Sequence, residues 1–111
     1  MDRIARYQEL IKQAFSSIAE DIPEEPNILT EVVLDDDRSH YEIFQMGWEG
    51  ERRVHGSLAH CDIRHGKTYV EYDGTDFGIA DFLVEKGFPC EEIVLGYRRP
   101  DLRDLTPFAL A

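Results

Sequence analysis

The chain contains little cysteine, no long apolar run and few basic residues for its size. Its 111 residues include two cysteines, Cys61 and Cys90, too few for a disulfide framework. No apolar run approaches the length of a bilayer-spanning helix, and the amino-terminal residues lack the continuous apolar stretch of a signal peptide. We therefore expect a cytoplasmic protein with reduced thiols, in which Cys61 is a small core residue.

The motifs of common catalytic sites are also missing. The sequence has no Gly-x-Ser-x-Gly nucleophile elbow, no phosphate-binding glycine loop and no short-spaced pair of cysteines or histidines typical of zinc sites. The aspartates at 35–37 lack the spacing of a calcium loop, so they predict an acidic turn. From these absences we expect a non-enzymatic protein without a cofactor or a bound metal.

Acidic residues outnumber basic ones and gather near the amino terminus. The chain has 23 Asp and Glu against 12 Lys and Arg, a net charge of −11, and residues 1–37 alone hold ten acids and three bases. Nucleic-acid affinity depends on Lys and Arg displacing counterions from phosphates, so we expect no direct nucleic-acid binding. The acidic stretch at 20–37 would instead attract a basic or mixed-charge protein partner. The alternative is that the acids only keep the protein soluble.

Hydrophobic periodicity predicts one α+β domain over residues 1–111. Apolar residues at three-four spacing indicate a helix over 2–19, capped by Asp2 and ended by Pro23. Alternating runs separated by short turns predict a four-stranded antiparallel meander, with strands at 29–34, 41–48, 52–63 and 67–72. A second helix is predicted over 76–86, ended by Gly87 in the left-handed conformation. A short extended segment at 93–97 and a tail that folds back on the body complete the chain.

The third predicted strand carries the residues of an alternative function, a small enzyme or metal-binding protein. That alternative uses His55, His60 and Asp62. On a regular strand His55 and His60 point to opposite faces and cannot share a metal, whereas His60 and Asp62 share a face. A third ligand would have to come from His40 or Cys61. Because both faces of this strand are of mixed polarity, we also expect one side of the sheet to be open or covered by a second subunit, as in a homodimer.

Two arginine pairs lie beside aromatic residues and form the candidate partner-binding set. Its members are Trp48, Arg52, Arg53, Tyr97, Arg98 and Arg99. Arginine and aromatic side chains are the usual anchors of protein interfaces. In the alternative interpretation, neighbouring arginines point to opposite sides and pair with Glu49, Glu51 or Asp101, while Trp48 belongs to the core.

Several strings of the sequence resemble one known family, chiefly from residue 40 to the carboxyl terminus. They are HY at 40–41, GW-x-G at 47–50, RRVHG at 52–56, DGT at 73–75, GIA at 78–80 and VLGY at 94–97. These strings are similar to the XisI family, named as a controlling factor for excision of the fdxN DNA element in filamentous cyanobacteria. The resemblance implies a small α+β protein without catalytic activity. It also implies a partner, XisH, and a site-specific recombinase, XisF, in an excision process that the protein assists.

Overall fold

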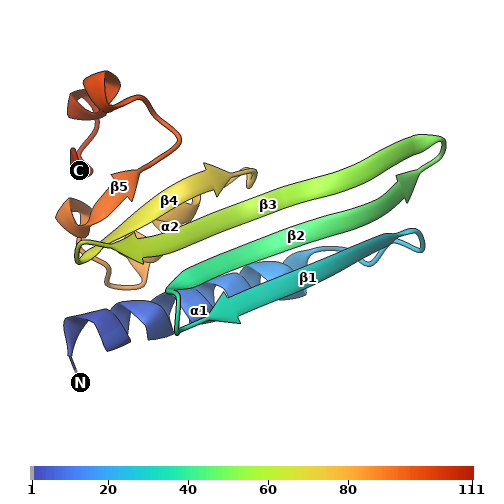
Figure 1. Ribbon diagram of the computed structural model, residues 1–111, viewed down its shortest axis with the longest axis horizontal. Coiled ribbons are helices and arrows are strands. Elements are labelled where there is room, and N and C mark those ends of the chain that lie inside the picture. The colour runs from blue at the N-terminus through green and yellow to red at the C-terminus, as the bar shows by residue number, and fades with distance from the viewer. Residues whose placement is uncertain (1) are drawn as a thin grey trace.

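The computed structural model describes residues 2–111 and has the α+β architecture that the sequence predicts (Figure 1). In chain order its elements are α1 (Arg3–Asp21), β1 (Ile28–Asp35), β2 (His40–Glu49), β3 (Arg52–Arg64), β4 (Lys67–Asp73), α2 (Ile79–Glu85), the 3-10 turn η1 (Cys90–Glu92), β5 (Ile93–Leu95) and the 3-10 turn η2 (Pro100–Leu105). Among the helices of these residues, none is long and apolar enough to cross a membrane.

The sheet has five strands, so the predicted four-stranded antiparallel meander is incomplete. The strand order is β1-β2-β3-β4-β5; consecutive strands from β1 to β4 pair antiparallel, and β5 pairs parallel with β4. Ile93, Val94 and Leu95 are all buried, which is typical of a strand in a parallel pair and leaves no alternation to recognise. The segment that contains α2 makes the crossover that a parallel connection requires. The tail folds back as predicted, because the Ala109 N–H donates to the Ile93 carbonyl, 2.8 Å apart.

Helix α1 forms where its periodicity predicts and supplies most of the helical side of the core. The Asp2 carboxylate caps it by accepting from the Ala5 N–H at 2.8 Å, which confirms the predicted cap. Its apolar stripe is buried and consists of Tyr7, Ile11, Ala14, Phe15 and Ile18. The helix ends at Asp21 because Pro23, two residues later, cannot continue it.

Helix α2 starts three residues later than predicted because Asp73 holds the preceding loop in a different conformation. The Asp73 carboxylate accepts from the N–H groups of Thr75 and Ile79, at 2.9 and 2.8 Å. The other end agrees with the prediction, since Gly87 has φ of 103° and the following N–H, of Phe88, donates back to the Leu83 carbonyl at 3.0 Å. The Phe88 ring then stacks on Tyr7, 4.2 Å between centroids, and so joins the two helices.

Both helices lie on one face of the sheet, and no helix of the described residues, 2–111, covers the other face (Figure 1). Tyr41 and Ile43 of β2 lie opposite Cys61 and Ala59 of β3, and all four side chains are fully buried beneath the helices. The prediction that Cys61 is a core residue is confirmed; burial raises the pKa of its thiol.

A β-bulge in β3 overturns the predicted separation of the histidines. Phe44 pairs with Ser57 but the preceding Ile43 pairs with Ala59, so Leu58 is an extra residue and the alternation reverses. His55 and His60 therefore lie on the same, uncovered face of the sheet. The contacts agree, because His55 meets the ring of Phe44 on β2 at 4.8 Å and His60 meets that of His40 at 4.4 Å.

Gly47 gives a direct test of the strand arrangement. Its φ is 151°, and a Cβ atom there would lie 1.9 Å from the backbone oxygen of Asn27, where no side chain can move aside. We expect Gly47→Ala to lower the free energy of unfolding by about 3 kcal/mol, measured by urea denaturation. Gly56→Ala is the matched control, since a Cβ at Gly56 meets nothing within 4 Å. Equal stabilities of the two variants would contradict the close approach of β2 to Asn27.

Candidate partner-binding site

The tip of the β2–β3 hairpin carries an exposed tryptophan and an arginine on the uncovered face. Trp48 and Arg53 are cross-strand partners, and the Arg53 guanidinium lies 5.3 Å from the centroid of the Trp48 ring. Trp48 is 51% exposed, so the interpretation of this residue as part of the core is wrong. Within residues 2–111 Arg53 makes no ion pair; it donates to the Gly47 carbonyl at 3.3 Å. The guanidinium therefore still has donors to offer.

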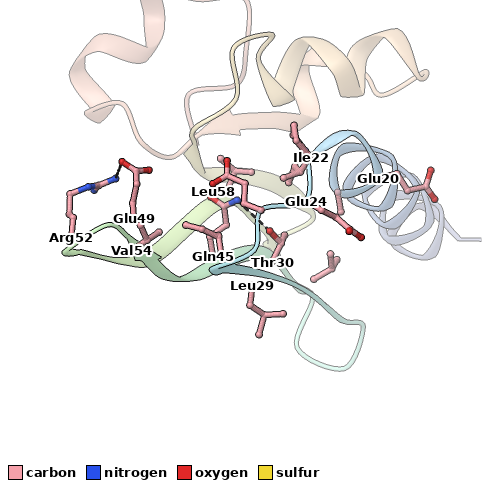
Figure 2. A pocket seen from close by; sticks show the side chains of 15 residues that line it. Glu20, Ile22, Glu24, Leu29, Thr30, Gln45, Glu49, Arg52, Val54 and Leu58 are labelled. Atoms are coloured by element: carbon pink, nitrogen blue, oxygen red, sulfur yellow. Dashed lines mark hydrogen bonds and ion pairs between the residues drawn. The ribbon is translucent and has the colours of Figure 1, made fainter.

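Arg52 takes part in a different contact from that of its neighbour Arg53. It pairs with Glu49 across the turn, 3.1 Å between Nη2 and Oε1, with both side chains largely exposed. Both residues line a groove on the helical side of the sheet (Figure 2). The alternative in which neighbouring arginines face opposite sides is therefore confirmed for this pair.

The second arginine pair lies far from the first. Tyr97, Arg98 and Arg99 follow β5, at the end of the molecule opposite the hairpin tip (Figure 1). Arg98 lies 5.7 Å from the Tyr97 ring centroid, and Arg99 pairs with Asp101 at 3.2 Å. The six candidate residues thus form two separate groups instead of one patch. A role in partner binding remains a prediction for each group.

The histidines do not assemble the alternative metal or catalytic site. On the uncovered face the His40 ring meets the carboxylate of Glu42 at 3.1 Å, and the buried Nε2 of His60 has no hydrogen-bond partner among residues 2–111. Asp62 is engaged by Arg64 at 3.3 Å, and His55 lies farther along the strand. No group of three ligand-type side chains close enough to hold a metal exists within residues 2–111.

Glu42 is the carboxylate that contacts His40. Burial raises the pKa of its carboxyl, but the Ser57 hydroxyl and the His40 ring outweigh that effect, so that the pKa lies below its usual value. Glu42 is therefore an ionised acceptor that holds His40, and it does not have the raised pKa that would suit a general acid.

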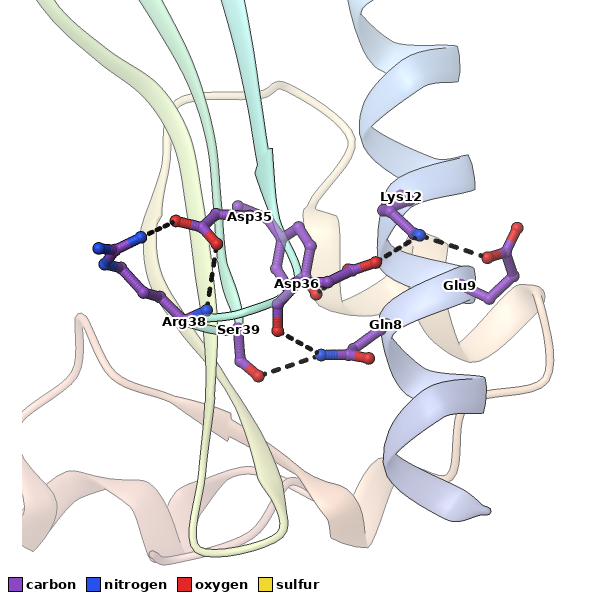
Figure 3. A network of polar contacts seen from close by, with 8 residues as sticks. Gln8, Glu9, Lys12, Asp35, Asp36, Arg38 and Ser39 are labelled. Carbon is purple, nitrogen blue, oxygen red and sulfur yellow. Dashed lines mark hydrogen bonds and ion pairs between the residues drawn. The ribbon is translucent and has the colours of Figure 1, made fainter. Parts of the chain in front are cut away.

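Part of the acidic stretch has a structural role in the β1–β2 turn (Figure 3). The Asp36 carboxylate accepts from Lys12 of α1 at 2.8 Å and from the Tyr41 hydroxyl at 2.7 Å. Gln8 donates to the Asp36 carbonyl at 3.0 Å, and Asp35 pairs with Arg38 at 3.0 Å. Asp36 therefore joins the turn to α1, Asp35 holds Arg38 within the turn, and both charges are locally compensated.

The remaining acids of this region have no such compensation. Within residues 2–111 no Lys, Arg or His side chain forms an ion pair with Glu20, Asp21, Glu24, Glu25, Glu31 or Asp37. Three of them, Glu20, Glu24 and Glu25, line the groove of about 810 Å³ that lies between the end of α1 and the sheet (Figure 2). The groove thus has an acidic border.

The floor of the groove is apolar. Ile22, in the loop after α1, and Ile28, at the start of β1, line it together with Val54 and Leu58 of β3. Both Val54 and Leu58 lie on the helical side of the sheet, and Leu58 also packs against the buried core. Such a groove fits apolar side chains flanked by cations. The sequence signal for it is Pro23, which ends α1 before the hairpin ends.

The pH dependence of stability tests the contacts that Asp36 makes with Lys12 and Tyr41. Hydrogen bonds from Lys12 and Tyr41 lower the pKa of its carboxyl, so the stability that it contributes is present at neutral pH and is lost as pH falls below about 4. We expect Asp36→Asn to be less stable than the parent at pH 7 and to approach it at pH 2, measured by urea denaturation at several pH values. Asp37→Asn removes the same charge without these contacts and should keep the parent profile. Parallel profiles of parent and Asp36→Asn would refute the network.

Comparison with known proteins agrees with the resemblance seen in the sequence. The family model of the XisI protein matches residues 1–110. A crystal structure of a XisI-like protein from Anabaena variabilis ATCC 29413 superposes with a TM-score of 0.92 at 34% identity, covering 97% of this chain and 99% of that one. No curated protein matches significantly.

A second solved structure links the fold to a process. The fdxN element excision controlling factor XisI from Anabaena variabilis ATCC 29413 superposes with a TM-score of 0.89 at 29% identity, covering 99% of this chain and 100% of that one. Both superpositions cover nearly the full length of each pair of chains, so the overall fold is shared. The chain therefore belongs to the XisI family, whose name comes from control of fdxN element excision.

Proposed function

We propose that this protein is a non-enzymatic controlling factor that binds an XisH-like protein and so assists recombinase-mediated excision of a DNA element. Family membership supports the process, since one solved relative is named as an excision controlling factor. The single observation that carries the partner-binding part is the apolar groove with its uncompensated acidic border. A border of this kind attracts a basic protein surface and repels phosphate.

The two parts of the surface have different roles in this proposal. The acids Glu20, Glu24 and Glu25 speed encounter, because attraction between opposite charges acts over about 10 Å at moderate salt. Trp48 and Arg53 supply the short-range anchor, since an exposed indole and a guanidinium without a carboxylate partner gain most from being buried by another protein. Tyr97 and Arg98 form a second contact region at the other end of the molecule.

Co-purification with the product of the neighbouring gene tests the proposal. We expect a complex, and we expect Trp48→Ala and Arg53→Glu to speed its dissociation about tenfold or more, measured by surface plasmon resonance. Phe77→Ala is the matched control, because Phe77 is 54% exposed but lies in the loop before α2. Absence of a complex at every ionic strength would remove the partner-binding function.

Rate measurements on the same complex distinguish electrostatic steering by the acidic residues from a role of these residues in solubility alone. Glu24→Lys with Glu25→Lys should slow association several-fold at low salt and weaken its salt dependence, while dissociation changes little. Asp76→Lys with Asp104→Lys makes the same change in net charge at exposed positions away from the groove. Equal association rates of the two double variants would leave the acids with a role in solubility alone.

Direct DNA binding is not part of this function. With a net charge of −11 and its arginine pairs at opposite ends, the isolated protein should show no sub-micromolar affinity for duplex DNA at about 150 mM salt. Fluorescence anisotropy with a labelled duplex measures this, and the partner complex serves as the comparison. Tight, salt-sensitive binding by the isolated protein would contradict the proposal.

A further inference from the structure

Strand β1 is the edge of the sheet on the side away from β5. It pairs with β2 and with no other strand of residues 2–111, and Figure 1 shows no segment beside its free edge. The strand is eight residues long, which is long enough to pair with a strand of ordinary length. Its free edge is therefore open to another chain.

The direction of the backbone groups follows from two hydrogen bonds at the start of the strand. The Trp48 N–H donates to the Asn27 carbonyl at 3.0 Å, so Asn27 and the alternate residues after it bond to β2. Ile28 faces the other way, since its N–H donates to the Glu25 carbonyl at 3.3 Å. By the same alternation Thr30, Val32 and Leu34 direct their N–H and C=O groups to the free edge.

The edge has few of the features that usually prevent pairing with another chain, and its charges are acidic. The strand ILTEVVLD contains no proline, lysine or arginine, and its register with β2 is unbroken over eight pairs. Its apolar side chains are exposed: Leu29 by 55%, Val32 by 38%, Val33 by 41% and Leu34 by 38%. An unprotected apolar edge of this kind is typical of a site where a partner adds a strand.

The charges around β1 indicate which kind of chain would pair with its free edge. A second copy of this protein would bring another net charge of −11 and would place Glu31 and the acids that flank β1 close to their own copies. A basic segment meets the opposite situation, because Glu24, Glu25 and Glu31 have no ion-pair partners within residues 2–111. Charge complementarity therefore favours a different, basic chain.

The side chains that line the groove indicate the sequence pattern that the added strand would need. Ile28, Thr30 and Val32 line the groove, so side chains on the same side of an added strand would enter it beside Ile22. We infer that β1 accepts an extended segment of the partner as a sixth strand, with alternating apolar and basic residues. The inference rests on the proposed function for the existence of a partner, but it assigns the edge and the chemistry of the segment independently.

A synthetic peptide, acetyl-KVRVKVRV-amide, tests the edge without the natural partner. We expect it to bind and to slow hydrogen exchange of the Thr30, Val32 and Leu34 amides, measured by NMR. N-methylation at alternate residues of the peptide on one edge should weaken binding about 100-fold, and N-methylation on the other edge should leave it unchanged. An acidic peptide, acetyl-EVEVEVEV-amide, should not bind. If the basic peptide leaves these amides unprotected, or if both methylated forms bind equally, the inference is overturned.

Two valines of matched exposure give the control on the protein side. Val32→Lys puts a cation on the free edge, and Val84→Lys puts one on α2, where the parent side chain is 39% exposed. Both variants change net charge equally. Val32→Lys should weaken binding of the basic peptide and of the partner at least tenfold, whereas Val84→Lys should change neither by more than about twofold.

These outcomes separate the inference from the proposed function. A partner that co-purifies and binds Val32→Lys as well as Val84→Lys leaves the proposed function intact and overturns the use of β1. A missing partner together with edge protection by the peptide removes the proposed function and supports the edge. If the protein alone protects these amides at the mass of a dimer, measured by light scattering, the occupant is a second copy and the inference is wrong.

Discussion

The packing of α1 on one face of the sheet is the constraint on which the rest of the structure depends. Ile11 and Phe15 are fully buried with Tyr41 and Ile43, and burial of each such side chain contributes about 2 kcal/mol. The 19 residues of α1 span about 28 Å, whereas the 13 residues of β3 span about 43 Å. Because the helix is shorter than β3, the β2–β3 hairpin extends past it and leaves the groove.

The acidic residues divide into two groups by their neighbours. Asp35 is compensated by Arg38 within the β1–β2 turn, and Asp36 is compensated by Lys12 and so holds the turn against α1 (Figure 3). The acids of the groove border have no counter-charge within residues 2–111, so their field reaches into solvent. Acidic residues thus have a structural role in the turn and a surface role at the groove, and only their contacts distinguish the two roles.

Much of the fold could be predicted because it depends on local rules. The three-four spacing of α1 and its Asp2 cap, the turns between β1 and β4, and the end of α2 at Gly87 all lie where the sequence predicts. An extended segment was predicted at 93–97, but its place in the sheet could not be recognised, because three buried apolar residues show no period. The start of α2 was misplaced because the Asp73 carboxylate bonds to a backbone group six residues away.

The sequence by itself determined the class of fold, the family and the sign of the surface charge, since these follow from periodicity, family-specific strings and composition. The tertiary structure decided which side chains meet. A single extra residue at the β3 bulge put His55 and His60 on one face, and the length of the molecule separated Trp48 and Arg53 from Tyr97 and Arg98. The groove and the free edge of β1 are also tertiary features, because each depends on where one element ends relative to another.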